Sequence, residues 1–164
     1  VCLGLPCHPR CIATLMIFQN TRVFAESPEE VYAAFVAPER LSRWWGPAGF
    51  RNEFEVFEPR EGGSWRFVMV GPDGTRYPNE SRIEALTPGE LIRVRHVNAP
   101  PFTLEIRLSP QDGGTLVTWT QAFDDPDLAQ SLAHILQPAN EQNLDRWQAE
   151  LRPPMLGKGG TRAG

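Results

Sequence analysis

The stretch from Ser27 to Pro47 reads S-P-E-E-V-Y-A-A-F-V-A-P-E-R-L-S-R-W-W-G-P, and it decides how the rest of the chain is interpreted. Its opening Ser-Pro-Glu-Glu is typical of a helix start, because the serine can cap the helix and Glu30 can return a hydrogen bond to the serine amide. A proline midway along the stretch restarts the helix, and the final Gly-Pro ends it. We therefore expect two short helices that finish with an aromatic pair, Trp44 and Trp45.

Beyond this stretch, the spacing of apolar residues changes to two, the period of a β-strand. Trp65, Phe67 and Met69, for example, share one face of an expected strand. Glycine-rich turns such as 112–114 separate the runs and are short enough to join neighbouring antiparallel strands. One further strand precedes the helices, so we expect seven strands, at about 14–24, 50–57, 65–70, 75–86, 91–97, 102–108 and 115–123.

The last element has an apolar stripe at helical spacing between Leu128 and Leu151, interrupted by Pro138. Proline removes a backbone hydrogen bond and clashes with the preceding turn. The stripe therefore predicts either two helices, at about 127–136 and 138–152, or one helix sharply kinked at the proline. An antiparallel sheet with one apolar face needs a cover, and this amphipathic segment can provide it. The expected fold class is α+β: a seven-stranded antiparallel sheet wrapped around a long C-terminal helix, with a possible cavity between them.

Composition excludes several classes of protein. With 164 residues, 41% of them apolar, the chain fits one domain with one core. Its formal net charge of -4 argues against nucleic-acid binding, which needs a clustered basic face. The sequence has no run of about eighteen apolar residues, so no membrane span is expected. We expect a cytoplasmic monomer without a cofactor or metal.

The two ends of the chain differ from the middle. Residues 1–15 carry all three cysteines without periodicity, and we interpret them as a disordered leader ahead of a natural start at Met16. A zinc knot of Cys2, Cys7, His8 and Cys11 is the alternative, but no second cysteine pair follows it, as zinc sites usually require. The expected domain spans 16–152, and the glycine-rich residues 153–164 are expected to form a flexible tail.

Several motifs together resemble one known family. They read S-P-E-E-V-Y-A-A-F, R-L-S-R-W-W-G-P-A-G-F, G-G-S-W-R-F, G-P-D-G-T-R-Y, G-T-L-V-T-W-T-Q-A-F and N-L-D-R-W. Over about residues 16–152 the chain is similar to the activator of heat shock protein 90 ATPase homologue-like family, within the START (SRPBCC, helix-grip) superfamily. The resemblance implies a seven-stranded sheet that grips a C-terminal helix around a deep apolar cavity. Relatives bind lipids, polyketides, hormones or other hydrophobic metabolites, and a minority catalyse reactions on them.

The residues expected to bind a ligand are mostly aromatic, because an enclosed apolar cavity is lined by such side chains. The same side chains could instead fill the core. His96 shares a face with Ile92 and Val94, and it could anchor a polar group or act as a general base. No catalytic residue is assigned. The candidate ligand-binding residues are Trp44, Trp45, Phe54, Trp65, Phe67, Met69, Tyr77, His96, Trp119, Leu136 and Trp147.

Three functions are compatible with these features. The leading hypothesis is a binder of a small hydrophobic molecule such as a lipid, a polyketide or an aromatic metabolite. The second is a cyclase- or hydrolase-like enzyme with His96 as acid-base and Tyr77 as its partner. The third is a module that assists a chaperone ATPase through an exposed patch that includes Trp44 and Trp45. The co-chaperone that gives the family its name has an additional domain without a counterpart in this sequence, so a chaperone partner is less favoured. The excess of arginine over a single lysine, Lys158, suggests a bacterial source.

Overall fold

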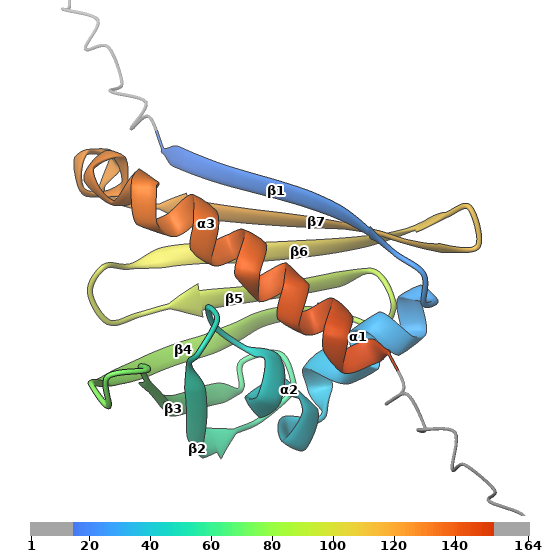
Figure 1. Cartoon of the computed structure of the whole chain (residues 1–164), viewed down its shortest axis with the longest axis horizontal. Coiled ribbons are helices and arrows are strands. Elements are labelled where there is room, and N and C mark those ends of the chain that lie inside the picture. Colours follow the sequence, from blue (N-terminus) through green and yellow to red (C-terminus); the bar gives the residue numbers. More distant parts are fainter. Residues whose placement is uncertain (1–14, 153–164) are drawn as a thin grey trace, which may run out of the picture.

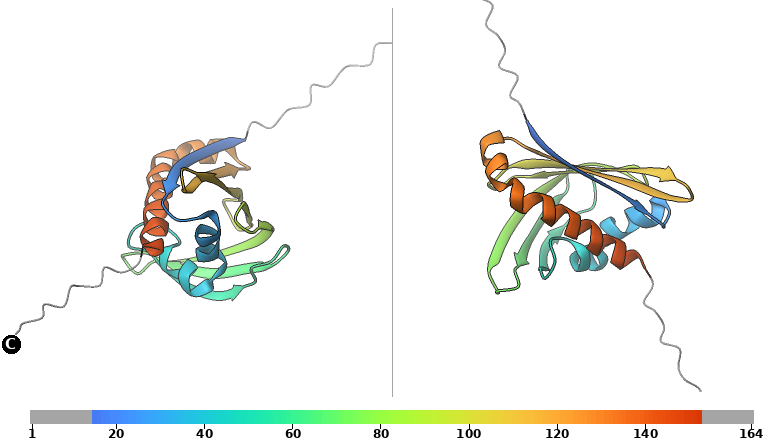
Figure 2. Two further views of the ribbon diagram at one scale, coloured as in Figure 1. Left: turned by 90° about the vertical axis from the view of Figure 1, so that its right-hand side faces the viewer. Right: turned by 45° about the horizontal axis from the view of Figure 1, so that its top comes forward.

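Seven strands form one antiparallel sheet in the order β1-β7-β6-β5-β4-β3-β2. The computed structural model describes residues 15–152. The sheet curves around one long helix, which lies across its concave face (Figures 1 and 2). The strands are β1 (Met16–Phe24), β2 (Arg51–Phe57), β3 (Ser64–Val70), β4 (Arg76–Thr87), β5 (Leu91–His96), β6 (Phe102–Gln111) and β7 (Gly114–Phe123).

The two short helices between the first two strands form as the sequence predicts. They are α1 (Pro28–Val36) and α2 (Pro38–Trp44). The capping box is complete: the Glu30 amide donates to Ser27 Oγ at 3.3 Å, and the Ser27 amide donates to Glu30 Oε2 at 3.0 Å. The fold class is therefore confirmed, down to the number of strands and the place of these helices.

The last helix, α3 (Pro126–Leu151), is continuous and has Pro138 inside it. Its first turns point in a different direction from the remainder, which crosses the sheet (Figures 1 and 2). A proline inside a helix is a common cause of such a bend, because one backbone hydrogen bond is lost there. Of the two alternatives raised by the sequence, the single kinked helix is correct.

Charged side chains fix α3 on both sides. Arg22 of β1 pairs with Glu141 and Asp145, and Arg43 of α2 donates to Glu150 of α3 at 2.6 Å. These pairs are partly exposed, so each contributes little to stability by itself. Their arrangement nevertheless fixes the register of the helix against the strand and against α2.

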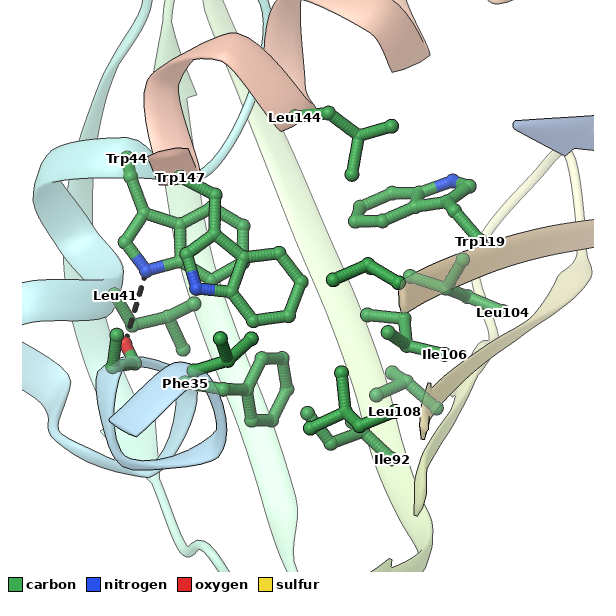
Figure 3. Close-up of a cluster of buried hydrophobic side chains, with 14 of the residues drawn as sticks. Phe35, Leu41, Trp44, Ile92, Leu104, Ile106, Leu108, Trp119, Leu144 and Trp147 are labelled. Carbon is green, nitrogen blue, oxygen red and sulfur yellow. Dashed lines mark hydrogen bonds between the residues drawn. The ribbon is translucent and has the colours of Figure 1, made fainter. Parts of the chain in front are cut away.

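One end of the concave face is filled by aromatic side chains from all three helices. Trp147 of α3 stacks on Trp44 of α2 with ring centres 4.3 Å apart (Figure 3). Phe35 of α1 meets Trp65 of β3 edge to face at 5.8 Å. The Trp44 indole N–H donates to the Ala34 carbonyl at 2.9 Å. This end of the sheet is therefore a packed core.

Some predictions made from the sequence concern residues outside the range that the structure describes. The proposed leader, apart from Leu15, and the proposed tail at 153–164 both lie there, as does the alternative zinc knot at Cys2, Cys7, His8 and Cys11. Between residues 15 and 152, no group of three or more histidine, cysteine, aspartate or glutamate side chains is arranged to hold a metal ion. None of the helices in that range combines the length and hydropathy needed to cross a bilayer.

Candidate ligand-binding site

A cavity of about 230 Å³ lies between the sheet and α3, directly beside the aromatic core. Successive strands of the meander run in opposite directions, so they enter and leave the cavity region alternately. Inward residues near the ends of β3, β5 and β7 and near the starts of β4 and β6 meet there. Met69, His96 and Gln121 represent the first group, and Asn79 and Phe102 the second.

Most of the cavity wall is apolar. Trp45 packs against Trp119 with ring centres 5.6 Å apart, and Phe67, Leu104 and Leu136 contribute further apolar surface. The strands present Phe67, Leu104 and Trp119 inward by simple alternation. Trp45 directly follows α2, and Leu136 comes from α3 just before its kink. A wall of this kind favours a hydrophobic guest.

Buried polar side chains interrupt this wall. Gln121, Asn140 and Asn143 are each no more than 6% exposed, and all three line the cavity. Asn140 Nδ2 donates to Gln121 Oε1 at 3.2 Å, and Asn143 Oδ1 accepts from the Gly46 amide. The cavity thus has a polar belt, formed where α3 faces β7.

His96 lies in the cavity wall, as its place in the strand predicts. Its ring stacks on Phe102 with centres 4.6 Å apart, and Nδ1 lies 3.4 Å from Ser81 Oγ. Burial, together with the smaller effect of the neighbouring Arg95 charge, lowers the pKa of His96 to about 4. The imidazole is therefore neutral at pH 7 and acts there as a hydrogen-bonding group without charge.

This shift makes stability depend on pH. Unfolded His96 titrates near 6.5 and folded His96 near 4, so the unfolded chain binds the extra proton first as the pH falls. The contribution of His96 to the free energy of unfolding should be fully present above pH 6.5 and should decrease toward pH 4. The expected loss between pH 7 and pH 5 is about 2 kcal/mol. Urea denaturation at several pH values would measure it. The variant His96→Gln should show a clearly flatter profile over this window, and an unchanged slope would contradict the assignment.

The loop that follows α2 forms part of the cavity wall and is bound to α3. The Arg146 guanidinium donates to the carbonyls of Arg43, Trp45, Gly46, Pro47 and Phe50 at 2.7–3.0 Å. Within residues 15–152 it pairs with no carboxylate, and burial lowers its pKa. Arg146 therefore uses its charge to hold Trp45 and Pro47 in place over the cavity.

Gly46 is required at the centre of that loop. Its φ of +93° lies in the left-handed region, and a Cβ there would come within 2.6 Å of Met69 Cε. Glycine tolerates both conditions because it has no side chain. The Gly-Pro pair that ends α2 therefore also allows the loop to approach the β3 side chains closely.

The structure brings together six of the predicted ligand-binding residues and separates five from them. Trp45, Phe67, Met69, His96, Trp119 and Leu136 line the cavity. Trp44, Trp147 and Trp65 belong to the buried core, and Phe54 packs against it. Tyr77 is 47% exposed, lies next to Phe50 at 6.0 Å between ring centres, and does not line the cavity.

Sequence reasoning missed the polar belt. Asn140 and Asn143 lie three residues apart on the same face of α3 as Leu136, Leu144 and Trp147, and Gln121 has the same inward parity in β7 as Trp119. The apolar period assigns these positions to the interior, where an asparagine or glutamine side chain is unusual because buried polar groups need hydrogen-bond partners. That mismatch was the available signal.

Comparisons with known proteins agree with this architecture. The family model described as activator of Hsp90 ATPase homolog 1-like protein matches residues 25–152. A crystal structure from Chromobacterium violaceum is similar with 27% identity and a TM-score of 0.74, over 84% of this chain and 99% of that one. A solution structure from Arthrobacter aurescens has 21% identity and a TM-score of 0.78, over 90% and 92% of the two chains.

A crystal structure from Rhodobacter sphaeroides has 24% identity and a TM-score of 0.73, over 82% of this chain and 90% of that one. These last two likenesses concern the fold alone. The comparison with curated proteins found no match.

Proposed function

This chain belongs to the activator of Hsp90 ATPase homolog 1-like family, and we propose that it binds one small hydrophobic molecule in the cavity between the sheet and α3. The observation that carries the proposal is the cavity itself, about 230 Å³ of space with a mainly apolar wall. The apolar side chains of this wall lack the packing contacts that a filled core would give them. A guest that fills the space recovers those contacts.

Binding is better supported than catalysis. The acid-base pair expected of an enzyme was His96 with Tyr77, but Tyr77 does not line the cavity and His96 has a pKa of about 4. A general base works best with a pKa near the working pH. A neutral imidazole beside Ser81 is instead suited to orienting a ligand through a hydrogen bond.

A chaperone-binding surface around Trp44 and Trp45 is also less supported. Trp44 is 1% exposed and Trp45 is partly buried against the core, so the pair does not offer the exposed patch that this hypothesis requires. The expected monomeric state and cytoplasmic location stay predictions from the sequence.

The proposal predicts site-specific changes when ligand is added. A mixture of neutral and acidic hydrophobic metabolites, added to ¹⁵N-labelled protein, should shift the indole signal of Trp45 and the amide signals of Trp119, Gln121 and Asn140. Signals from the outward-facing strand residue Thr118 provide the internal control. Native mass spectrometry of the freshly purified protein would show whether a guest co-purifies. No shift at the cavity residues with any mixture, together with no co-purifying mass, would refute the proposal.

A further inference from the structure

Resting on the proposed function, we infer that the ligand is an uncharged compact amphiphile: one ring or two fused rings carrying a hydroxyl or carbonyl group. Ionised lipids such as fatty acids are excluded. The inference uses the charge, the polar belt and the size of the cavity.

Among residues 15–152, no side chain that is ionised at pH 7 lines the cavity. The wall formed by this range contains no aspartate, glutamate, lysine or arginine, and its histidine, His96, is neutral at pH 7. Arg146, whose guanidinium binds the loop that forms part of the wall, already donates to five backbone carbonyls. Arg95 and Arg22 are paired with Asp124 and with carboxylates of α3. In the part of the chain that the structure describes, a buried carboxylate would therefore find no cation in the cavity wall, and an unpaired buried charge is strongly unfavourable.

The polar belt, by contrast, offers groups that a ligand can use. Gln121 Nε2, Asn143 Nδ2 and Asn140 Oδ1 have no hydrogen-bond partner within residues 15–152, and all three side chains line the cavity. Together they provide two donors and one acceptor, each on a side chain at least 94% buried. A pure hydrocarbon would leave these groups unpaired, whereas a hydroxyl can both accept from an amide N–H and donate to an amide oxygen.

The volume limits the size of the guest. An engineered apolar cavity of about 150 Å³ holds one benzene molecule, and sites for drug-sized ligands begin at about 300 Å³. The cavity here, at about 230 Å³, lies between these values. It can bury one substituted ring or two fused rings, whereas much of a long acyl chain would extend beyond it.

Three probes with the same ring system separate these contributions: naphthalene, 2-naphthol and 2-naphthoate, titrated calorimetrically into the full chain at pH 7. We expect 2-naphthol to bind at least tenfold more tightly than 2-naphthoate, because the carboxylate must be desolvated without a partner. We also expect 2-naphthol to bind more tightly than naphthalene, because its hydroxyl pairs with the belt.

The variant Gln121→Leu tests the belt, because leucine keeps the size and removes the amide. The substitution should lower the affinity for 2-naphthol about tenfold and leave the affinity for naphthalene unchanged. Gln130→Leu, at an exposed position of α3, is the matched control and should change neither affinity. A uniform loss for all three probes in Gln121→Leu would mean altered packing and would contradict the role of the amide.

The outcomes distinguish the two proposals. If 2-naphthoate binds as tightly as 2-naphthol, the inference of an uncharged ligand is wrong while hydrophobic binding stands. If 2-naphthol does not bind but the metabolite mixture shifts the cavity signals, the inferred ligand class is wrong and the cavity is still a binding site. If 2-naphthol does not bind and the metabolite mixture causes no shift at the cavity residues, both proposals fail.

Discussion

Replacing Trp147 by alanine should lower the free energy of unfolding by about 3–5 kcal/mol, the range measured for large-to-small changes at buried aromatic sites. Trp147 is fully buried, stacks on Trp44 at 4.3 Å and meets Phe24 edge to face at 5.7 Å. Within residues 15–152 its indole N–H has no hydrogen-bond partner, so the loss comes from packing. The stack joins α2 to α3, and its removal leaves a void between two helices that cannot easily collapse (Figure 3).

Urea denaturation followed by far-UV circular dichroism would measure this loss. Gln137→Ala, at an exposed position of the same helix, is the matched control and should change stability by less than about 0.5 kcal/mol. Trp147→Phe should fall between the two, because it retains one aromatic ring. A loss below about 1 kcal/mol in Trp147→Ala would show that this end of the sheet is not the packed core described above.

The fold could be predicted from local rules because each rule acts over a few neighbouring residues. The capping box at Ser27 and Glu30 forms as written, and alternation places Phe67 and Trp119 on the inner face of the sheet. At Pro138 the sequence allows two alternatives, a break or a bend. Proline breaks one hydrogen bond whether the helix stops or bends, and only packing on both sides decides between them.

The candidate site was predicted less completely, for a geometric reason. The alternation of apolar and polar residues predicts which face of the sheet a side chain occupies. It does not predict how far that side chain lies from the helices that fill one end of the concave face. Trp65 and Phe67 share a face of β3, yet Trp65 meets Phe35 in the core whereas Phe67 reaches the cavity. The aromatic residue type is the same in both environments, so residue type alone could not separate them.

The buried amides were missed because polar residues of a helix are normally assigned to its solvent face. Asn140 and Asn143 contradict that assignment only once the direction of α3 across the sheet is known. His96 was found because a histidine among inward-facing valine and isoleucine stands out in a strand. Its neutral state at pH 7, however, follows from the depth of burial, which the sequence does not give.

Filling the cavity from α3 should abolish binding while the fold persists. Ala139 is half-buried and lines the cavity just after the kink, so Ala139→Phe directs a phenyl ring into it. One benzene needs about 150 Å³, so the ring takes most of the 230 Å³ available. We expect the affinity for 2-naphthol, or for a guest that co-purifies, to fall at least 100-fold.

The free energy of unfolding should change by less than the 1–3 kcal/mol typical of overpacking, because the ring enters empty space. Calorimetric titration and urea denaturation measure the two effects, with the exposed Gln137→Phe as matched control. If Ala139→Phe folds normally and binds like the unsubstituted chain, the ligand occupies another part of the molecule, and the site described here is wrong.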